Sequence, residues 1–114
     1  MQIKEIAKIL NGKIICCQDC VENEVFSACG SDMMSDVLAY VKEQAVLVTG
    51  LCNPQVVRTA EMMDIKCIVL VRDKQANEIM ISLAKDHNIV IICTSEKMFD
   101  ACGKLYAAGL NGSL

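Results

Sequence analysis

Short apolar runs alternate with stretches of helical spacing over the second half of the chain, from Ala45 onward. The runs at 45–49, 66–71 and 89–93 are rich in β-branched residues and are continuously apolar. They are too short to be half-exposed helices, so they predict buried strands. Strands that alternate with helices are typical of a parallel sheet with crossover helices. We therefore predict an α/β fold, a single layered domain with a mostly parallel sheet flanked by helices.

Three helices are expected to cover this part of the sheet. The first starts at Asn53-Pro54, because asparagine is a favoured N-cap and proline a favoured first helical residue. The second spans 75–87, and the third begins near Thr94-Ser95 and ends before Gly109. Helical spacing predicts the following inward-facing residues: Val56, Val57, Ala60, Met63, Ala76, Ile79, Met80, Leu83, Ala84, Met98, Phe99, Cys102, Leu105 and Tyr106.

The first third of the chain is less regular. A short amphipathic helix at 3–10 is expected to end at Asn11-Gly12, a usual helix-ending pair, and extended segments follow at 13–17 and 24–29. Gly30-Ser31 then opens a helix whose inward-facing residues are predicted to be Met33, Met34, Val37, Leu38 and Val41. We expect one domain over residues 1–109 and a flexible tail over residues 110–114.

Composition and charge exclude several classes of protein. The chain has 114 residues, of which 54% are hydrophobic and 22% charged, which is typical of a domain with one core. The net charge is −3 and only two arginines occur, Arg58 and Arg72, so a nucleic-acid partner is not expected. Neither a signal-peptide pattern nor an apolar run of the ~18 residues that a membrane span needs is present. We expect a cytoplasmic protein with no membrane partner.

The eight cysteines are expected to be reduced in that compartment. The sharpest local feature is a C-x-x-C motif with an extra cysteine, formed by Cys16, Cys17 and Cys20. Acidic neighbours disfavour the thiolate that redox chemistry needs, and no second ligand pair completes a zinc or iron-sulfur site. A metal-binding or redox protein that uses these three cysteines is therefore kept as an alternative, and no cofactor is predicted.

No catalytic constellation is recognisable in the sequence. The only histidine, His87, falls at the end of a predicted helix, where it is expected to cap. The sequence contains no nucleophile elbow, no phosphate-binding loop motif and no G-x-G-x-x-G. We therefore predict that the protein is not an enzyme.

The remaining candidate site is the edge of the sheet at which the parallel strands end. Open parallel sheets bind ligands beyond these carboxyl ends, where helix N-termini offer free amide donors. An arginine among hydroxyls and amides suits an anionic small molecule such as a nucleotide or a phosphate ester, although helix capping and turns explain the same residue types. This predicted rim consists of Gly30, Ser31, Thr49, Gly50, Asn53, Arg72, Asp73, Thr94 and Ser95.

The chain from Met1 to about Gly109 resembles a DRTGG domain. The similarity covers the opening helix with Asn11-Gly12, the helix start at Gly30-Ser31, the strand at 46–50 and the run at 86–94 before the last helix. The resemblance implies a fold like that of the N-terminal domains of HPr kinase and the Mur ligases. It also implies a ligand-sensing or regulatory role, occurrence beside CBS domains, and a homodimer.

The motif that gives this family its name is absent. Its Asp-Arg pair would fall at Leu51-Cys52, and its Thr-Gly-Gly would fall near 71–73, where this chain has Val-Arg-Asp. Thr49 and Gly50 are the site positions that match. The resemblance therefore predicts the fold, and of the site it predicts only the positions of Thr49 and Gly50.

We hypothesise a non-catalytic regulatory domain that binds an anionic metabolite or a protein partner at the predicted rim. A third possibility is a purely structural interaction module with an exposed methionine surface. Helical spacing favours core positions for those methionines, which are Met33, Met34, Met62 and Met63.

Overall fold

The computed structural model describes residues 1–40 and 44–112. The elements follow in the order α1 (Ile3–Ile9), β1 (Lys13–Cys16), the 3-10 turn η1 (Gln18–Cys20), β2 (Ser27–Gly30), α2 (Met34–Tyr40), β3 (Ala45–Thr49), α3 (Pro54–Met62), β4 (Cys67–Leu70), α4 (Glu78–Asp86), β5 (Val90–Cys93) and α5 (Met98–Ala107). Each predicted strand and helix is present, and the predicted α/β class is confirmed. In the described ranges, every helix is too short or too polar to cross a membrane.

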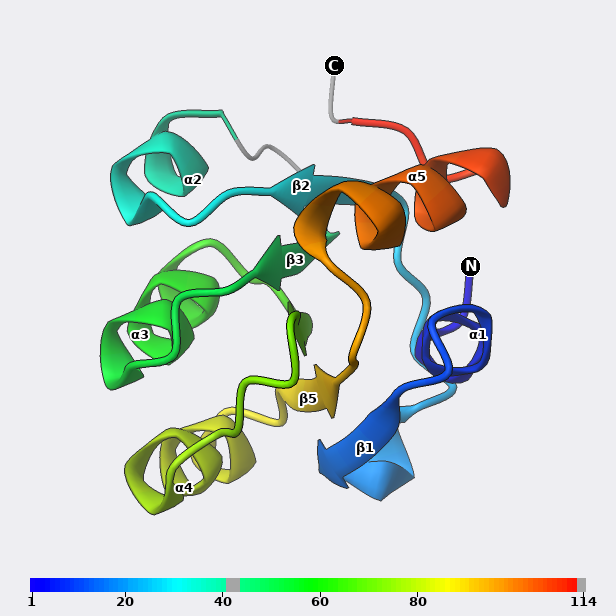
Figure 1. Ribbon diagram of the computed structural model, residues 1–114. Coiled ribbons are helices and arrows are strands. Elements are labelled where there is room, and N and C mark those ends of the chain that lie inside the picture. Colours follow the sequence, from blue (N-terminus) through cyan, green and yellow to red (C-terminus); the bar gives the residue numbers. More distant parts are fainter. Residues whose placement is uncertain (41–43, 113–114) are drawn as a thin grey trace.

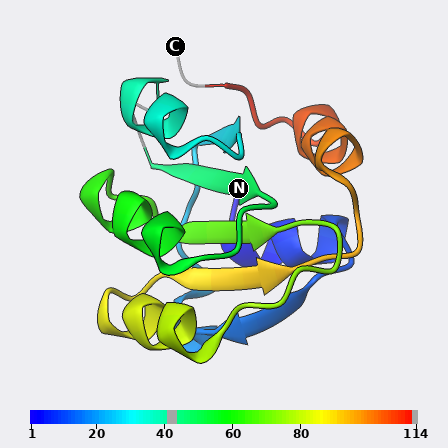
Figure 2. The same ribbon diagram turned by 60° about the vertical axis from the view of Figure 1, so that its left-hand side comes forward.

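The strands form one sheet in the order β1-β5-β4-β3-β2. The four strands from β2 to β5 are parallel neighbours, and β1 pairs with β5 in the antiparallel direction. Figure 2 shows β3, β4 and β5, coloured from green to yellow, pointing the same way. The loops that follow β2 to β5 therefore meet at one edge of the sheet, which we call the carboxyl edge.

Helices cover both faces of the sheet. Figure 1 shows α2, α3 and α4 on one face and α1 and α5 on the other. Successive residues of each strand point to opposite faces of the sheet and belong to two separate apolar clusters. Leu47 and Ile68 belong to the first cluster, and Val69 and Ile92 belong to the second. Because both faces are covered, β3, β4 and β5 are buried along their whole length, which explains their continuous apolar runs.

Four helices end with the same backbone motif. A residue in the left-handed region follows the last turn, and the next amide donates to the carbonyl five residues back, as in a Schellman motif. Asparagine, aspartate and glycine tolerate this conformation best. The left-handed residues are Asn11, Asp64, Asn88 and Gly109. The predicted stop at Asn11-Gly12 is confirmed, and so is the position of His87, which is the C-cap of α4.

The predicted starts of α1 and α3 are confirmed, and those of α2, α4 and α5 are wrong. Helix α2 begins at Met34 rather than at Gly30-Ser31. The side chain of Asn53 accepts a hydrogen bond from the Gln55 amide at 2.9 Å, so α3 begins as predicted. Helix α4 begins later than predicted, at Glu78, because the side chain of Asn77 caps it. Helix α5 also begins later, at Met98, because the residues after β5 are used in a loop.

Several residues predicted to face the core are exposed instead. The helices have only seven to ten residues, and each buries a narrow stripe against the sheet, such as Met34 and Val37 in α2 or Ala101 and Leu105 in α5. Positions beside these stripes stay in solvent. The wrongly placed residues are Met33, Leu38, Ile79, Phe99 and Tyr106. Val41, also predicted to face inward, lies outside the described residues.

Packing continues past the last helix. Leu110 is buried, and the carbonyl of Asn111 accepts a hydrogen bond from the Ala28 amide of β2 at 3.0 Å. Contact with the core therefore extends two residues beyond the expected domain end at residue 109.

Candidate functional site

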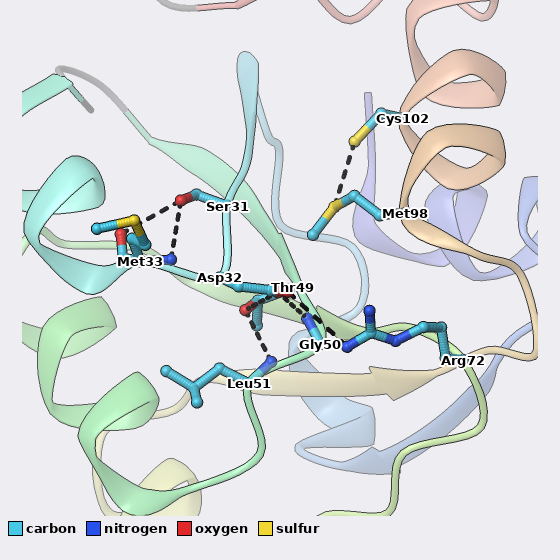
Figure 3. Close-up of polar contacts among 9 residues, drawn as sticks. All are labelled: Ser31, Asp32, Met33, Thr49, Gly50, Leu51, Arg72, Met98 and Cys102. Atoms are coloured by element: carbon cyan, nitrogen blue, oxygen red, sulfur yellow. Dashed lines mark hydrogen bonds and ion pairs between the residues drawn. The ribbon is translucent and has the colours of Figure 1, made fainter.

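Three of the predicted rim residues come together at the carboxyl edge around a residue that the sequence analysis missed. Thr49 is the last residue of β3, Gly50 follows it, and Arg72 lies in the loop after β4. Between them lies Asp32, which occupies the connection from β2 to α2. We call these four residues the Asp32 cluster (Figure 3).

The Asp32 carboxylate is held from three sides. Its Oδ1 atom accepts hydrogen bonds from the Gly50 amide at 2.6 Å and from the Thr49 hydroxyl at 3.2 Å. Its Oδ2 atom faces the Nη2 atom of Arg72 at 3.8 Å. Hydrogen bonds to an ionised acceptor are stronger than neutral ones, so Gly50 and Thr49 fix the carboxylate in place. The signal in the sequence was an acidic residue two positions after the end of a strand.

The backbone around Arg72 is unusual and sets the position of its side chain. Arg72 and Asp73 both lie in the left-handed region, with φ of 59° and 58°. This conformation costs free energy in residues other than glycine, and surrounding contacts must enforce it. Here the Arg72 amide donates to the Glu96 carbonyl at 2.8 Å, and the Asp73 amide donates to the Thr94 carbonyl at 3.0 Å. The loop after β5 therefore clamps the loop after β4.

Gly50 provides the space in which the Arg72 side chain lies. A Cβ atom added to Gly50 would stand 2.7 Å from the Cζ atom of Arg72 and would also contact Nη2 and Nε. The guanidinium thus packs against the bare Cα of Gly50 (Figure 3). Both Arg72 and Asp32 are about half exposed, and exposed ion pairs contribute only about 0–1 kcal/mol. The contact between Arg72 and Asp32 is therefore a weak, partly exposed ion pair.

Several other rim residues hold the loops together, as the capping interpretation expects. Ser31 Oγ accepts from the Met33 amide at 3.0 Å before α2, and Asn53 caps α3. Thr94 is buried; its hydroxyl donates to the Leu10 carbonyl at 2.8 Å and accepts from the Glu96 amide at 3.2 Å.

The three remaining rim residues lie outside the Asp32 cluster. Gly30 packs under α5, where an added Cβ atom would stand 2.6 Å from the Cys102 sulfur. Asp73 and Ser95 are exposed at the carboxyl edge. The structure therefore separates a small polar cluster from a larger set of capping, packing and surface residues.

The cysteine motif lies away from this site. Because β1 is antiparallel to β5, Cys16, Cys17 and Cys20 lie at the opposite edge of the sheet. Cys16 Sγ donates to the Ile89 carbonyl at 3.5 Å, and Cys20 Sγ contacts Asp19 at 3.8 Å. Over residues 1–40 and 44–112, no three His, Cys, Asp or Glu side chains form a group that could hold a metal ion.

The electrostatics of the cysteine motif oppose redox chemistry. Burial, together with the neighbouring Cys16, Cys20 and Asp19, raises the pKa of the Cys17 thiol from its ordinary value of 9.0 to about 12. Burial and Asp19 also raise the pKa of the Cys20 thiol. A reactive cysteine needs a lowered pKa, so these thiols are poor nucleophiles at neutral pH.

The methionines of the interaction-module alternative do not form one surface. Met34 is buried, and Met63 packs against the core. Met33 is exposed before α2 at the carboxyl edge, whereas Met62 is exposed at the far end of α3. The preferred core interpretation is thus right for Met34 and Met63 and wrong for the other two.

Comparisons with known proteins show the family to which the chain belongs and a solved structure with a similar fold. Residues 5–108 match the model of the DRTGG domain family. No curated protein sequence matched the chain. Among solved structures, the chain is similar to the CBS and DRTGG domains of the regulatory region of Clostridium perfringens pyrophosphatase, complexed with an activator, diadenosine tetraphosphate.

That likeness shows the fold. The TM-score is 0.72 at 14% sequence identity, and the match covers 91% of this chain. The chain spans 45% of the length of the pyrophosphatase region.

Proposed function

The chain belongs to the DRTGG domain family, and on this basis we propose that it is a non-catalytic regulatory domain that senses an anionic metabolite. The ligand is of the nucleotide or phosphate-ester class, and it binds at the carboxyl edge. One observation carries the proposal: the half-exposed Arg72 guanidinium lies at the carboxyl edge, and its contact with the Asp32 carboxylate is 3.8 Å long. The nucleotide activator in the similar pyrophosphatase region supports this ligand class.

Arg72 is the group that would bind the ligand anion. A guanidinium presents N–H donors in a fork that matches a phosphate, and such paired hydrogen bonds are strong. The present partner of Arg72 is a carboxylate oxygen at 3.8 Å, which is longer than a hydrogen bond. A phosphate can therefore compete for Arg72 at little cost in free energy.

The proposal includes a cytoplasmic location and a homodimer. Eight free cysteines are the state expected in a reducing compartment. The homodimer follows from the family resemblance alone, and analytical ultracentrifugation tests it directly.

Replacing Arg72 by alanine is expected to weaken nucleotide binding about tenfold or more, because a hydrogen bond to a charged group contributes about 1.5–3 kcal/mol. A nucleotide present at 100 times its Kd stabilises the unmodified chain by about 2.7 kcal/mol, which a thermal-shift screen detects. The screen contains adenine nucleotides, diadenosine tetraphosphate and sugar phosphates, and calorimetry then gives the affinities.

Arg58→Ala is the matched control, because it removes the same charge from an exposed arginine on α3 outside the Asp32 cluster. Equal weakening by the two substitutions would show that Arg72 is not the binding group. If no compound of the panel raises the melting temperature of the unmodified chain, the small-ligand proposal is refuted and a protein partner at the same edge is favoured.

A further inference from the structure

We propose that Asp32 determines which anions the carboxyl edge accepts. The ligand must bring hydroxyl groups beside its phosphate, as a ribose phosphate does, and simple anions are disfavoured. This inference rests on the proposed function, because it concerns the specificity of the same site. It follows from the way in which the Asp32 cluster distributes its donors and acceptors.

The amide and hydroxyl donors of the cluster are not offered to a ligand. The Gly50 amide and the Thr49 hydroxyl both donate to Asp32 Oδ1, at 2.6 Å and 3.2 Å. A ligand phosphate placed there would have to displace a carboxylate that these donors already satisfy. It would also face the negative charge of Asp32 at close range.

The other carboxylate oxygen is an available acceptor. Among residues 1–40 and 44–112, Asp32 Oδ2 has only the 3.8 Å contact with Arg72, and 47% of the Asp32 side chain is exposed. The lone pairs of this oxygen can accept hydrogen bonds from hydroxyl groups, because an ionised carboxylate accepts at both oxygens. A vicinal diol presents two such donors side by side.

The acceptor and the arginine donors lie next to each other. The Arg72 guanidinium packs against Gly50, and 45% of the Arg72 side chain is exposed to solvent. A simple anion meets attraction from Arg72 and repulsion from Asp32 at the same place. A hydroxylated phosphate ester satisfies both, with its phosphate on Arg72 and its hydroxyls on Asp32.

The backbone keeps Asp32 in this position. The Ser31 amide donates to the Val48 carbonyl at 3.0 Å, which extends the pairing of β2 with β3. The Ser31 hydroxyl then accepts from the Met33 amide at 3.0 Å, where the chain turns into α2. Asp32 lies between these two fixed residues, so the backbone holds its carboxylate at the site.

The test compares four probes by calorimetry: AMP, its 2′,3′-dideoxy analogue, ribose 5-phosphate and pyrophosphate. The unmodified chain is expected to bind AMP about tenfold more tightly than the dideoxy analogue or pyrophosphate, because a site that hydrogen-bonds a hydroxyl discriminates against analogues that lack it. Asp32→Asn keeps an oxygen that accepts from Gly50 but removes the charge. It is expected to bind pyrophosphate about tenfold more tightly and to lose the preference for the ribose hydroxyls.

Asp73→Asn is the control, because it removes the same charge from an exposed residue of the carboxyl edge outside the Asp32 cluster. It is expected to keep the probe preferences of the unmodified chain. Ribose 5-phosphate binding as tightly as AMP would identify a sugar phosphate as the recognised part, and weaker binding would identify the whole nucleotide; both support the inference.

Two results overturn the inference while an anion site remains: equal affinity of the unmodified chain for AMP, the dideoxy analogue and pyrophosphate, or unchanged discrimination in Asp32→Asn. Absence of binding by every probe to both proteins overturns the proposed function itself. The probe comparison on the unmodified chain needs no substitution, so it decides the matter even where a variant does not fold.

Discussion

At pH 8, iodoacetamide is expected to alkylate Cys17 about thirtyfold more slowly in the folded protein than in the unfolded chain. Burial and neighbouring groups raise the pKa of the Cys17 thiol from 9.0 to about 12, which lowers its thiolate fraction about a thousandfold. A thiolate of higher pKa is intrinsically more nucleophilic, and this recovers part of the rate. Quantitative mass spectrometry of the Cys17 peptide, with and without guanidinium chloride, measures the ratio.

The direction of this shift also gives a dependence of stability on pH. The folded state disfavours the Cys17 thiolate, so the stability due to the neutral thiol is complete below pH 9 and is lost as the pH rises toward 12. Alkylation of Cys17 at the same rate in folded and unfolded protein would contradict the assignment of an unreactive thiol. It would also restore the redox alternative for the C-x-x-C motif.

The Thr94→Val substitution is expected to lower the free energy of unfolding by about 1–3 kcal/mol. Valine has the shape of threonine but lacks the hydroxyl that donates to the Leu10 carbonyl and accepts from the Glu96 amide. The substitution therefore leaves a buried carbonyl and a partly buried amide without their partner. Urea unfolding, analysed by linear extrapolation, measures the change.

Thr59→Val is the matched control for this prediction. Thr59 is as buried as Thr94, but its hydroxyl has no hydrogen-bond partner among residues 1–40 and 44–112. Removal of an unpaired buried hydroxyl is expected to be neutral or stabilising. Equal losses in the two variants would mean that the Thr94 hydrogen bonds do not stabilise the loop after β5.

The fold was predictable because local signals and burial agree. Strands buried on both faces are continuously apolar, as in β4 and β5. The start of α3 is marked by its N-cap residue Asn53 and by Pro54 at the first helical position. Faces of short helices were harder to predict, because helical spacing assigns Phe99 inward although the sheet buries only a narrow stripe of α5. The order of the strands depends on pairing between distant segments, which periodicity does not encode.

The candidate site was predictable in part. The rule that ligands bind at strand ends placed Thr49, Gly50 and Arg72 at one edge, and the structure brings these three together. Asp32 was missed because its partners lie 17 residues or more away in the sequence.

The backbone at the absent family motif has a physical explanation. The Thr-Gly-Gly of the family would fall near 71–73, and here Arg72 and Asp73 adopt the left-handed conformation that glycine favours. Contacts from the loop after β5 enforce this conformation on two other residue types. The loop shape therefore does not depend on glycine, and the arginine side chain becomes part of the site.

Two-dimensional amide NMR during a titration with AMP and then with diadenosine tetraphosphate tests whether a nucleotide binds at the carboxyl edge. We expect saturable shifts of the amides of Thr49, Gly50 and Arg72 at the carboxyl edge. We also expect unchanged signals for residues 16–20 at the opposite edge. Shifts confined to the cysteine motif, or spectra that both nucleotides leave unchanged, would contradict nucleotide binding at the carboxyl edge.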